Sequence, residues 1–169
     1  AWENLEVIID LGGNTLKRNK VIINAVVNSS TPMFDTNVVF KNGRLETGAS
    51  VIGVTHCLFA TEKIKTYNFT FNEVTFVNAA AKRTIPMISA CWENGSTVVN
   101  AGIKANITLN GCTIDLGNIT NGIAVGFTND AKATNTVGTL NLNGGTIISG
   151  GNGYSIAATD KDDTVILGA

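Results

Sequence analysis

Several residue types that mark common functional classes are scarce in this 169-residue chain. Only two prolines and one histidine are present, and charged residues make up 15% of the sequence, with 12 basic and 13 acidic side chains. No run of Lys or Arg forms the basic footprint of a nucleic-acid-binding protein. The longest apolar stretches, such as VIINAVV at 21–27, are far shorter than the roughly 20 residues of a membrane-spanning helix. We therefore expect neither a nucleic-acid partner nor a membrane span.

The abundant residues point to β-structure. Asn and Thr contribute 21 residues each and Gly contributes 18, beside many Val and Ile residues. β-Branched residues favour strands, whereas Asn and Gly favour the tight turns between them. With 44% hydrophobic residues, the sequence predicts a single globular all-β domain over residues 1–169. The abrupt start at Ala1-Trp2 suits a secreted protein that has lost its leader, or a shortened chain.

A pattern of roughly 30 residues recurs along the chain. TLNLNGGTIISG at 139–150 closely matches NITLNGCTIDLG at 106–117. We call a set of equivalent positions in the repeats a column. The reference column is Leu16, Leu45, Phe76, Ile114 and Ile147. Two apolar columns precede it. The first consists of Ile9, Val38, Phe69, Ile107 and Leu140. The second consists of Leu11, Phe40, Phe71, Leu109 and Leu142. Between these two lies a mostly polar column, Asp10, Val39, Thr70, Thr108 and Asn141. A mostly Thr column comes directly before the reference, Thr15, Arg44, Thr75, Thr113 and Thr146.

Alternating apolar and polar columns predict strands with one buried face, and each repeat holds a second apolar segment. The sequence therefore predicts a parallel β-helix (β-solenoid) of about five coils of roughly 30 residues. Equivalent strands would pair in parallel about 4.8 Å apart, stacking apolar columns inward and Asn and Thr ladders outward. An antiparallel sandwich is the alternative, but it does not require the same columns to recur.

The repeats carry a family resemblance. Units such as NGGTIISGGNGYSIAAT at 143–159 resemble the right-handed parallel β-helices of the pectate-lyase-like group, in particular repeats of secreted and cell-surface proteins of bacteria and archaea. Because polysaccharide-cleaving enzymes share this fold, the resemblance raises the expectation of a lyase or hydrolase with clustered acids.

The acidic residues of this chain are not clustered in that way. Glu46 and Asp115 share a column but lie two coils apart, and DKDD at 160–163 is expected to be a solvated turn. Arg44 is expected to pair with Glu46 at the surface.

No catalytic, cofactor-binding or metal-binding residue is expected. His56 adjoins Cys57, but neighbouring residues on a strand point to opposite faces. The spacing of Cys57, Cys91 and Cys112 does not match a zinc site. These three cysteines are instead candidates for cross-linking. Cys57 and Cys91 are about one coil apart and could be bridged, whereas Cys112 is expected to be exposed at a turn, available to another chain. Three buried, unreacted thiols are an equally weighted alternative.

Open strand edges are expected at both ends of the domain. LEVIIDL at 5–11 already has a strand pattern, and TVILGA at 164–169 begins a further coil, with Val165 and Leu167 in the two apolar columns. Such edges favour pairing with copies of the same chain or with neighbouring coils of a longer chain.

The favoured function is an extracellular structural protein that self-assembles through these edges into a cell-surface sheath, layer or fibre, similar in character to archaeal sheath proteins. The alternative is a fragment of a surface adhesin that binds cell-surface glycans through outward Asn and Thr residues, Trp92 and Tyr154. A polysaccharide lyase or hydrolase fragment is less favoured.

Overall fold

The structure is a computed structural model, and every regular element in its described part is a β-strand. The residues that it describes are 5–20, 22–26, 36–49, 51–55, 65–81, 86–89, 103–119, 123–126, 137–148, 154–157 and 164–168. Within these ranges no helix is long and apolar enough to cross a membrane. The all-β prediction is confirmed for this part of the chain.

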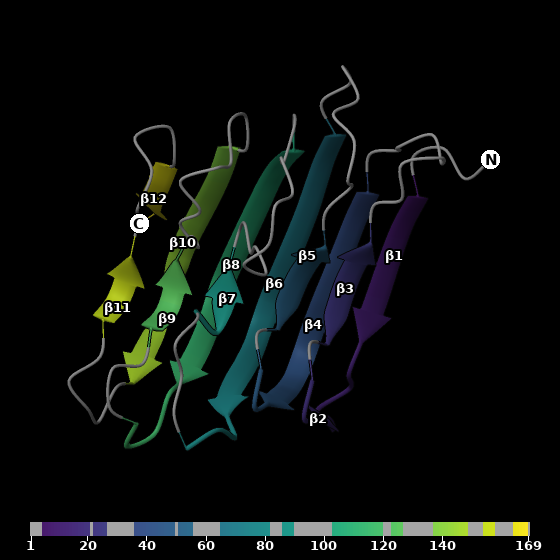
Figure 1. Cartoon of the computed structure of the whole chain (residues 1–169). Coiled ribbons are helices and arrows are strands. Elements are labelled where there is room, and N and C mark those ends of the chain that lie inside the picture. The colour runs from purple at the N-terminus through teal and green to yellow at the C-terminus, as the bar shows by residue number, and fades with distance from the viewer. Residues whose placement is uncertain are drawn as a thin grey trace.

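A seven-stranded parallel sheet is the main element of the structure (Figure 1). Its spatial order is β1-β4-β6-β8-β10-β12, and β2 pairs with β4 beside β1. The strands are β1 (Leu5–Asp10), β2 (Thr15–Arg18), β4 (Thr36–Thr47), β6 (Lys65–Asn78), β8 (Ile103–Asp115), β10 (Val137–Ile148) and β12 (Thr164–Gly168). Neighbours in this order come from successive repeats, so the sheet is built by stacking one repeat on the next.

Two smaller parallel sheets contain the second apolar segment of each repeat. One pairs β3 (Ile23–Val26) with β5 (Ile52–Thr55), and the other has the order β11-β9-β7, from β7 (Ile88–Ser89), β9 (Ile123–Gly126) and β11 (Tyr154–Ala157). In Figure 1 the arrows of these short strands point the opposite way from those of the main sheet. A backbone hydrogen bond of 2.8 Å from Val51 to Met87 links the segments just before β5 and β7.

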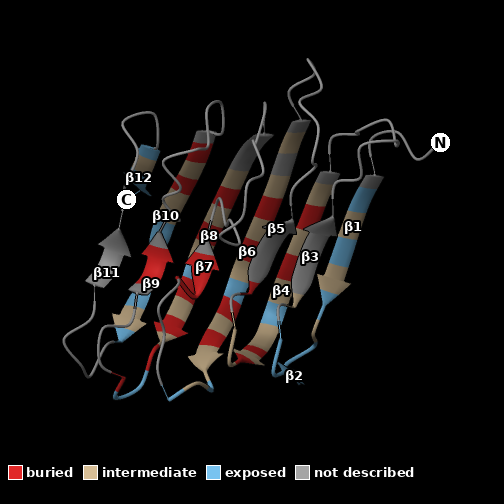
Figure 2. Ribbon diagram, in the orientation of Figure 1, coloured by how far each residue is buried: buried red, intermediate tan, exposed pale blue. Residues whose placement is uncertain are grey.

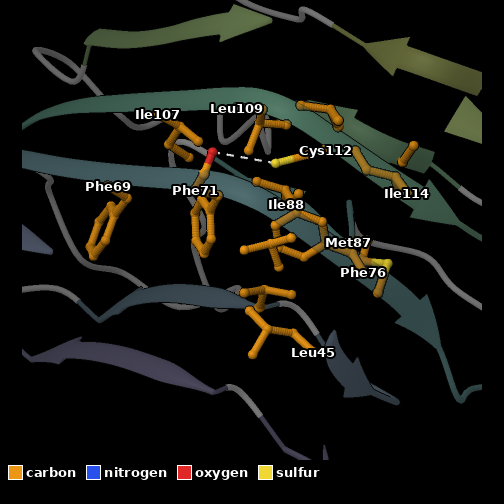
Figure 3. Packing of buried hydrophobic residues seen from close by; sticks show 14 of the residues in the cluster. Leu45, Phe69, Phe71, Phe76, Met87, Ile88, Ile107, Leu109, Cys112 and Ile114 are labelled. Atoms are coloured by element: carbon orange, nitrogen blue, oxygen red, sulfur yellow. Dashed lines mark hydrogen bonds between the residues drawn. The ribbon is translucent and has the colours of Figure 1, made fainter. Parts of the chain in front are cut away.

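The hydrophobic core is one cluster that joins the inner face of the main sheet to residues of the smaller sheets. Phe71 of β6 stacks on Phe40 of β4, with ring centroids 5.6 Å apart, and meets Phe76 edge-to-face at 5.0 Å. Figure 3 shows Met87 and Ile88 packed close to these rings. Burial is most complete in β4, β6, β8 and β10 and declines in β1 and β12 (Figure 2). Full burial of such side chains stabilises a fold by about 1.5–3 kcal/mol each.

The strand register confirms the columns predicted from β4 onward. Phe69 pairs with both Val38 and Ile107, and Leu140 pairs with Ile107 and Val165. Leu167 pairs with Leu142, so β12 continues both apolar columns by one strand, at the two residues expected. The reference and Thr columns are confirmed from the first repeat onward.

One correction concerns the first repeat, where the two apolar columns are shifted by two residues. The structure pairs Val7 with Val38 and Ile9 with Phe40, so Ile8, and not Asp10, lies beside Val39. The cause is the corner between β1 and β2, residues 11–14, which has two residues more than the equivalent corner at 42–43. Gly12 and Gly13 adopt φ values of 57° and 81°, so this longer corner turns where the other repeats only bend.

Each later repeat bends at an equivalent residue with positive φ, and in β10 the next residue, Gly145, also has a positive φ of 109°. The equivalent positions are Asn42 (56°), Glu73 (53°), Gly111 (60°) and Gly144 (67°), and the strand continues on both sides. Glycine adopts this conformation without strain and Asn tolerates it, whereas Glu rarely does. The expected turns are therefore bends within continuous strands. Together with the Asn ladders described below, the parallel sheet is compatible with a β-helix.

Candidate functional site: the outer face and edges of the main sheet

The outer face of the main sheet carries a ladder of stacked Asn side chains. Asn110 donates through Nδ2 to Oδ1 of Asn72 at 2.7 Å, and Asn143 donates in the same way to Asn110 at 2.8 Å. These residues come from β6, β8 and β10 and pair in register. Asn110 in the middle therefore both donates and accepts along the stacking direction, which the parallel register makes possible.

A second ladder runs parallel to the first, four residues earlier in each strand. Asn68 donates to Asn37 at 2.7 Å, and Asn106 donates to Asn68 at 2.9 Å. Between the ladders, Asn141 donates to the Thr108 hydroxyl at 3.4 Å. The donor of every one of these bonds lies in the later repeat. The outward polar ladders expected from the sequence are thus present, and their amide groups point the same way.

Charged side chains gather at the β1–β2 end of the sheet. Glu46 forms ion pairs with Lys17 and with Arg44, the latter at 3.2 Å, and Asp10 pairs with Lys41 at 3.2 Å. The expected Arg44–Glu46 pair is confirmed. The hydrogen bond from Lys17, then that from Arg44, lowers the pKa of Glu46 below its usual value. The backbone N–H of Gly12, then Lys41, lowers the pKa of Asp10 in the same way. These contacts strengthen the outermost strands at this edge.

The exposed large hydrophobic side chains of the described residues all lie at the two edges of the main sheet. They are Ile8 and Leu16 in β1 and β2, Ile166 and Leu167 in β12, and Ile148 at the end of β10. Of these, Leu167 is 71% exposed and Ile8 is 59% exposed. Edge strands also present backbone groups that can pair with another strand. The edges therefore combine exposed apolar side chains with strand backbone that can accept a further strand.

A hollow of about 340 Å³ opens at the β12 edge. It forms because β12 pairs with β10 only from Thr139 to Asn143, so β12 does not extend over residues 144–148 of β10. Its lining is mostly apolar and includes Leu109, Ile147 and Leu167. An extended segment could add to the sheet at this position.

Cys112 corrects one expectation, because its side chain is buried and only 4% exposed. It shares a column with the fully buried Val74, directly after the bend, where the strand turns its next side chain inward. The thiol donates to the Phe71 carbonyl at 3.3 Å (Figure 3), and burial raises its pKa. A protonated, enclosed thiol is a poor cross-linking group in the folded chain. Cys112 is unpaired, and Cys57 and Cys91 lie outside the described residues.

The residues considered for catalysis are separated or lie outside the described ranges. Glu46 and Asp115 share a column with Val77 between them, as expected. The Asp115 carboxylate accepts a 2.8 Å hydrogen bond from the Gly117 backbone, which is a local turn contact. His56, Trp92 and residues 160–163 lie outside the described residues, as does the side chain of Tyr154. Within the described ranges, no group of three or more His, Cys, Asp or Glu could hold a metal ion.

No protein-family model matches the chain, and no curated protein or solved structure matches it.

The edge role of Ile8 was missed in the sequence, although a signal was present. The segments EVIID at 6–10 and TVILG at 164–168 share their apolar order, which aligns Val7 with Val165 and Ile8 with Ile166. Comparing the two ends with each other, rather than aligning every repeat on its turn, would have found the two-residue shift.

Proposed function

We propose that this chain is an extracellular structural protein that self-assembles through the edges of its main sheet into a cell-surface sheath, layer or fibre. In this proposal the fold is a β-solenoid of about five coils of roughly 30 residues. The observation that carries it is that, among the residues the structure describes, the exposed large hydrophobic side chains all lie at the two edges of the main sheet. Isolated exposed apolar residues are common on proteins, but here they coincide with strand edges that can template pairing.

Two other features support assembly. Charged residues make up only 15% of the chain, so repulsion between stacked copies is weak. The Asn ladders, which join β4, β6, β8 and β10, have the same donor direction throughout, which suits parallel stacking of equivalent strands. The surface location rests on the resemblance of the repeats to those of secreted prokaryotic surface proteins and, more weakly, of sheath proteins.

The test is negative-stain electron microscopy with sedimentation velocity on the purified chain. We expect regular fibres, hoops or sheets, and we expect Ile166→Lys to reduce the assembled fraction because a lysine on an edge strand opposes pairing. Thr70→Lys is the matched control, since it places the same charge in the same column at the centre of the sheet. Monomers at all concentrations would overturn self-assembly of this chain and leave neighbouring coils of a longer chain as the partners of the edges.

A surface adhesin is the second candidate, favoured by the regular polar face. Asn and Thr columns at strand spacing offer repeated amide and hydroxyl groups that match the hydrogen-bonding groups of glycans. Glycan-array binding that is lost in Asn106→Ala and Asn110→Ala variants would support this function. Assembly without glycan binding would support the structural role.

A further inference from the structure

We infer that copies of this chain stack head to tail, with β1 of one copy paired in parallel with β12 of the next and Ile8 opposite Ile166. This inference rests on the proposed function and specifies the register of the contact. It concerns the two outermost strands of the main sheet, each of which pairs on only one side within the described residues.

The columns of the sheet define this register without adjustment. Ile8 pairs with Val39 at one edge, and Ile166 pairs with Asn141 at the other, and both lie in the same outward column. An inward column lies on either side of it. One of these columns runs from Val7 in β1 to Val165 in β12, and the other runs from Ile9 in β1 to Leu167 in β12. Stacking β1 on β12 would therefore bring three apolar pairs into contact at once.

The outward column that contains Ile8 and Ile166 distinguishes the edges from the interior of the sheet. Its members in spatial order are Ile8, Val39, Thr70, Thr108, Asn141 and Ile166. Isoleucine therefore occurs in this outward column only at the two outermost strands, where Ile8 is 59% and Ile166 47% exposed. A pair of β-branched residues directly opposite each other on neighbouring strands stabilises a sheet by about 0.2–1 kcal/mol beyond an Ala pair. This change of residue type is explained if the two edges face each other.

A second copy fits better than an unrelated strand, because the contact continues the interface that already joins β10 to β12. The strand direction, spacing and register would be those of every other pair in the sheet. Charges do not oppose it, since Glu6 would face Thr164 and Asp10 would face Gly168. A head-to-tail contact of this kind does not close on itself unless the stack curves, and it therefore generates filaments or hoops.

The hollow beside β12 defines a competing register. In that arrangement β2 would add to the end of β10, placing Lys17 opposite Ile148 and Leu16 over the hollow. Because β1 and β2 both pair with β4, β1 would then need the position that β12 occupies on β10. The contact of β1 with β12 keeps every strand of both copies in place, and we therefore assign that register.

Disulfide trapping between two different variants tests the register. Ile8→Cys and Ile166→Cys chains are mixed, assembled and mildly oxidised, and the cross-linked peptides are mapped by mass spectrometry, which also separates them from the three native cysteines. Directly opposite Cα atoms on parallel strands are about 4.8 Å apart, within the range for a disulfide. A bond between positions 8 and 166 is intermolecular, since neither chain contains both substitutions. Circular dichroism of each variant confirms that the sheet is retained.

The matched control mixes Ile8→Cys with Thr164→Cys, which moves the second thiol two residues along the same exposed face. We expect at least about tenfold more cross-linked product for the 8–166 pair, because of its geometry. The register would be overturned by cross-links of the competing arrangement in place of the 8–166 bond. These form in mixtures of Lys17→Cys with Ile148→Cys, or of Ile8→Cys with Asn141→Cys. Assemblies seen by microscopy without the 8–166 bond would overturn this inference and leave the proposed function intact. Monomers alone would overturn both.

Discussion

The side-chain nitrogen of Asn110 donates a 2.7 Å hydrogen bond to the side-chain oxygen of Asn72, which lies 38 residues earlier in the chain. Asn143 donates to Asn110 in turn, at 2.8 Å, so Asn110 is the central member of the ladder. A contact between residues so far apart in sequence repeats at the strand spacing because the parallel register brings equivalent residues side by side.

Replacing Asn110 by Ala should therefore destabilise the protein more than replacing Asn143. Asn110→Ala removes two ladder hydrogen bonds, whereas Asn143→Ala removes one from a more exposed position. We expect losses of about 1–2 kcal/mol and about 0.5–1 kcal/mol respectively. The free energy of unfolding from urea titrations measures both values. Equal losses would show that the ladder contributes nothing beyond local effects.

Stability should depend on pH through Glu46. Its carboxylate is bound by Lys17 and Arg44, and its pKa in the folded chain lies below the usual 4.5. The ionised form therefore stabilises the fold fully above the unfolded pKa, and this contribution is lost as the pH falls through the folded pKa. Between about pH 5 and about pH 3 the melting temperature of the native chain should fall more steeply than that of Glu46→Gln. Asp10 titrates in both proteins and serves as the internal reference. Parallel curves for the two proteins would contradict the prediction.

The inner columns were predictable because burial imposes a pattern that a reader can see. Phe69, Ile107 and Leu140 are apolar at the same position of successive repeats, and stacking one repeat on the next buries all three side chains. The outward ladders were predictable for a related reason, since repeated Asn residues in a parallel register meet their equivalents.

The first repeat was not predictable from the same alignment, because it was aligned on its turn. Gly12 and Gly13 lengthen that turn by two residues, and the pairing of Val7 with Val38 shows the resulting shift. Cys112 was misplaced for a different reason. Its position follows a bend and was expected to be part of an exposed turn, although the buried Val74 occupies the same column.

The burial of Cys112 predicts slow reaction with thiol reagents. Its thiol is enclosed, donates to the Phe71 carbonyl and has a raised pKa, so little thiolate is available at neutral pH. We expect alkylation by N-ethylmaleimide at pH 7 to be at least about tenfold slower in the folded protein than in urea, as judged for the peptide that contains Cys112. A small model thiol assayed in the same two buffers controls for the effect of urea on the reagent. Equal rates in the two states would mean that the site opens readily or is exposed.

Two adjacent glycines should differ sharply in their tolerance of alanine. Both Gly144 and Gly145 have positive φ, at 67° and 109°, so each substitution introduces backbone strain. A Cβ at Gly144 meets nothing within 4 Å, whereas a Cβ at Gly145 would lie 2.1 Å from the backbone oxygen of Cys112 in the neighbouring strand. We expect Gly144→Ala to cost about 1 kcal/mol from strain alone. Gly145→Ala should cost at least about 3 kcal/mol or abolish folding, because the backbone of β8 or β10 must move. Urea titration of the two variants beside the native chain measures the difference. A Gly145→Ala variant as stable as Gly144→Ala would show that the two strands separate more easily at this bend than their register implies.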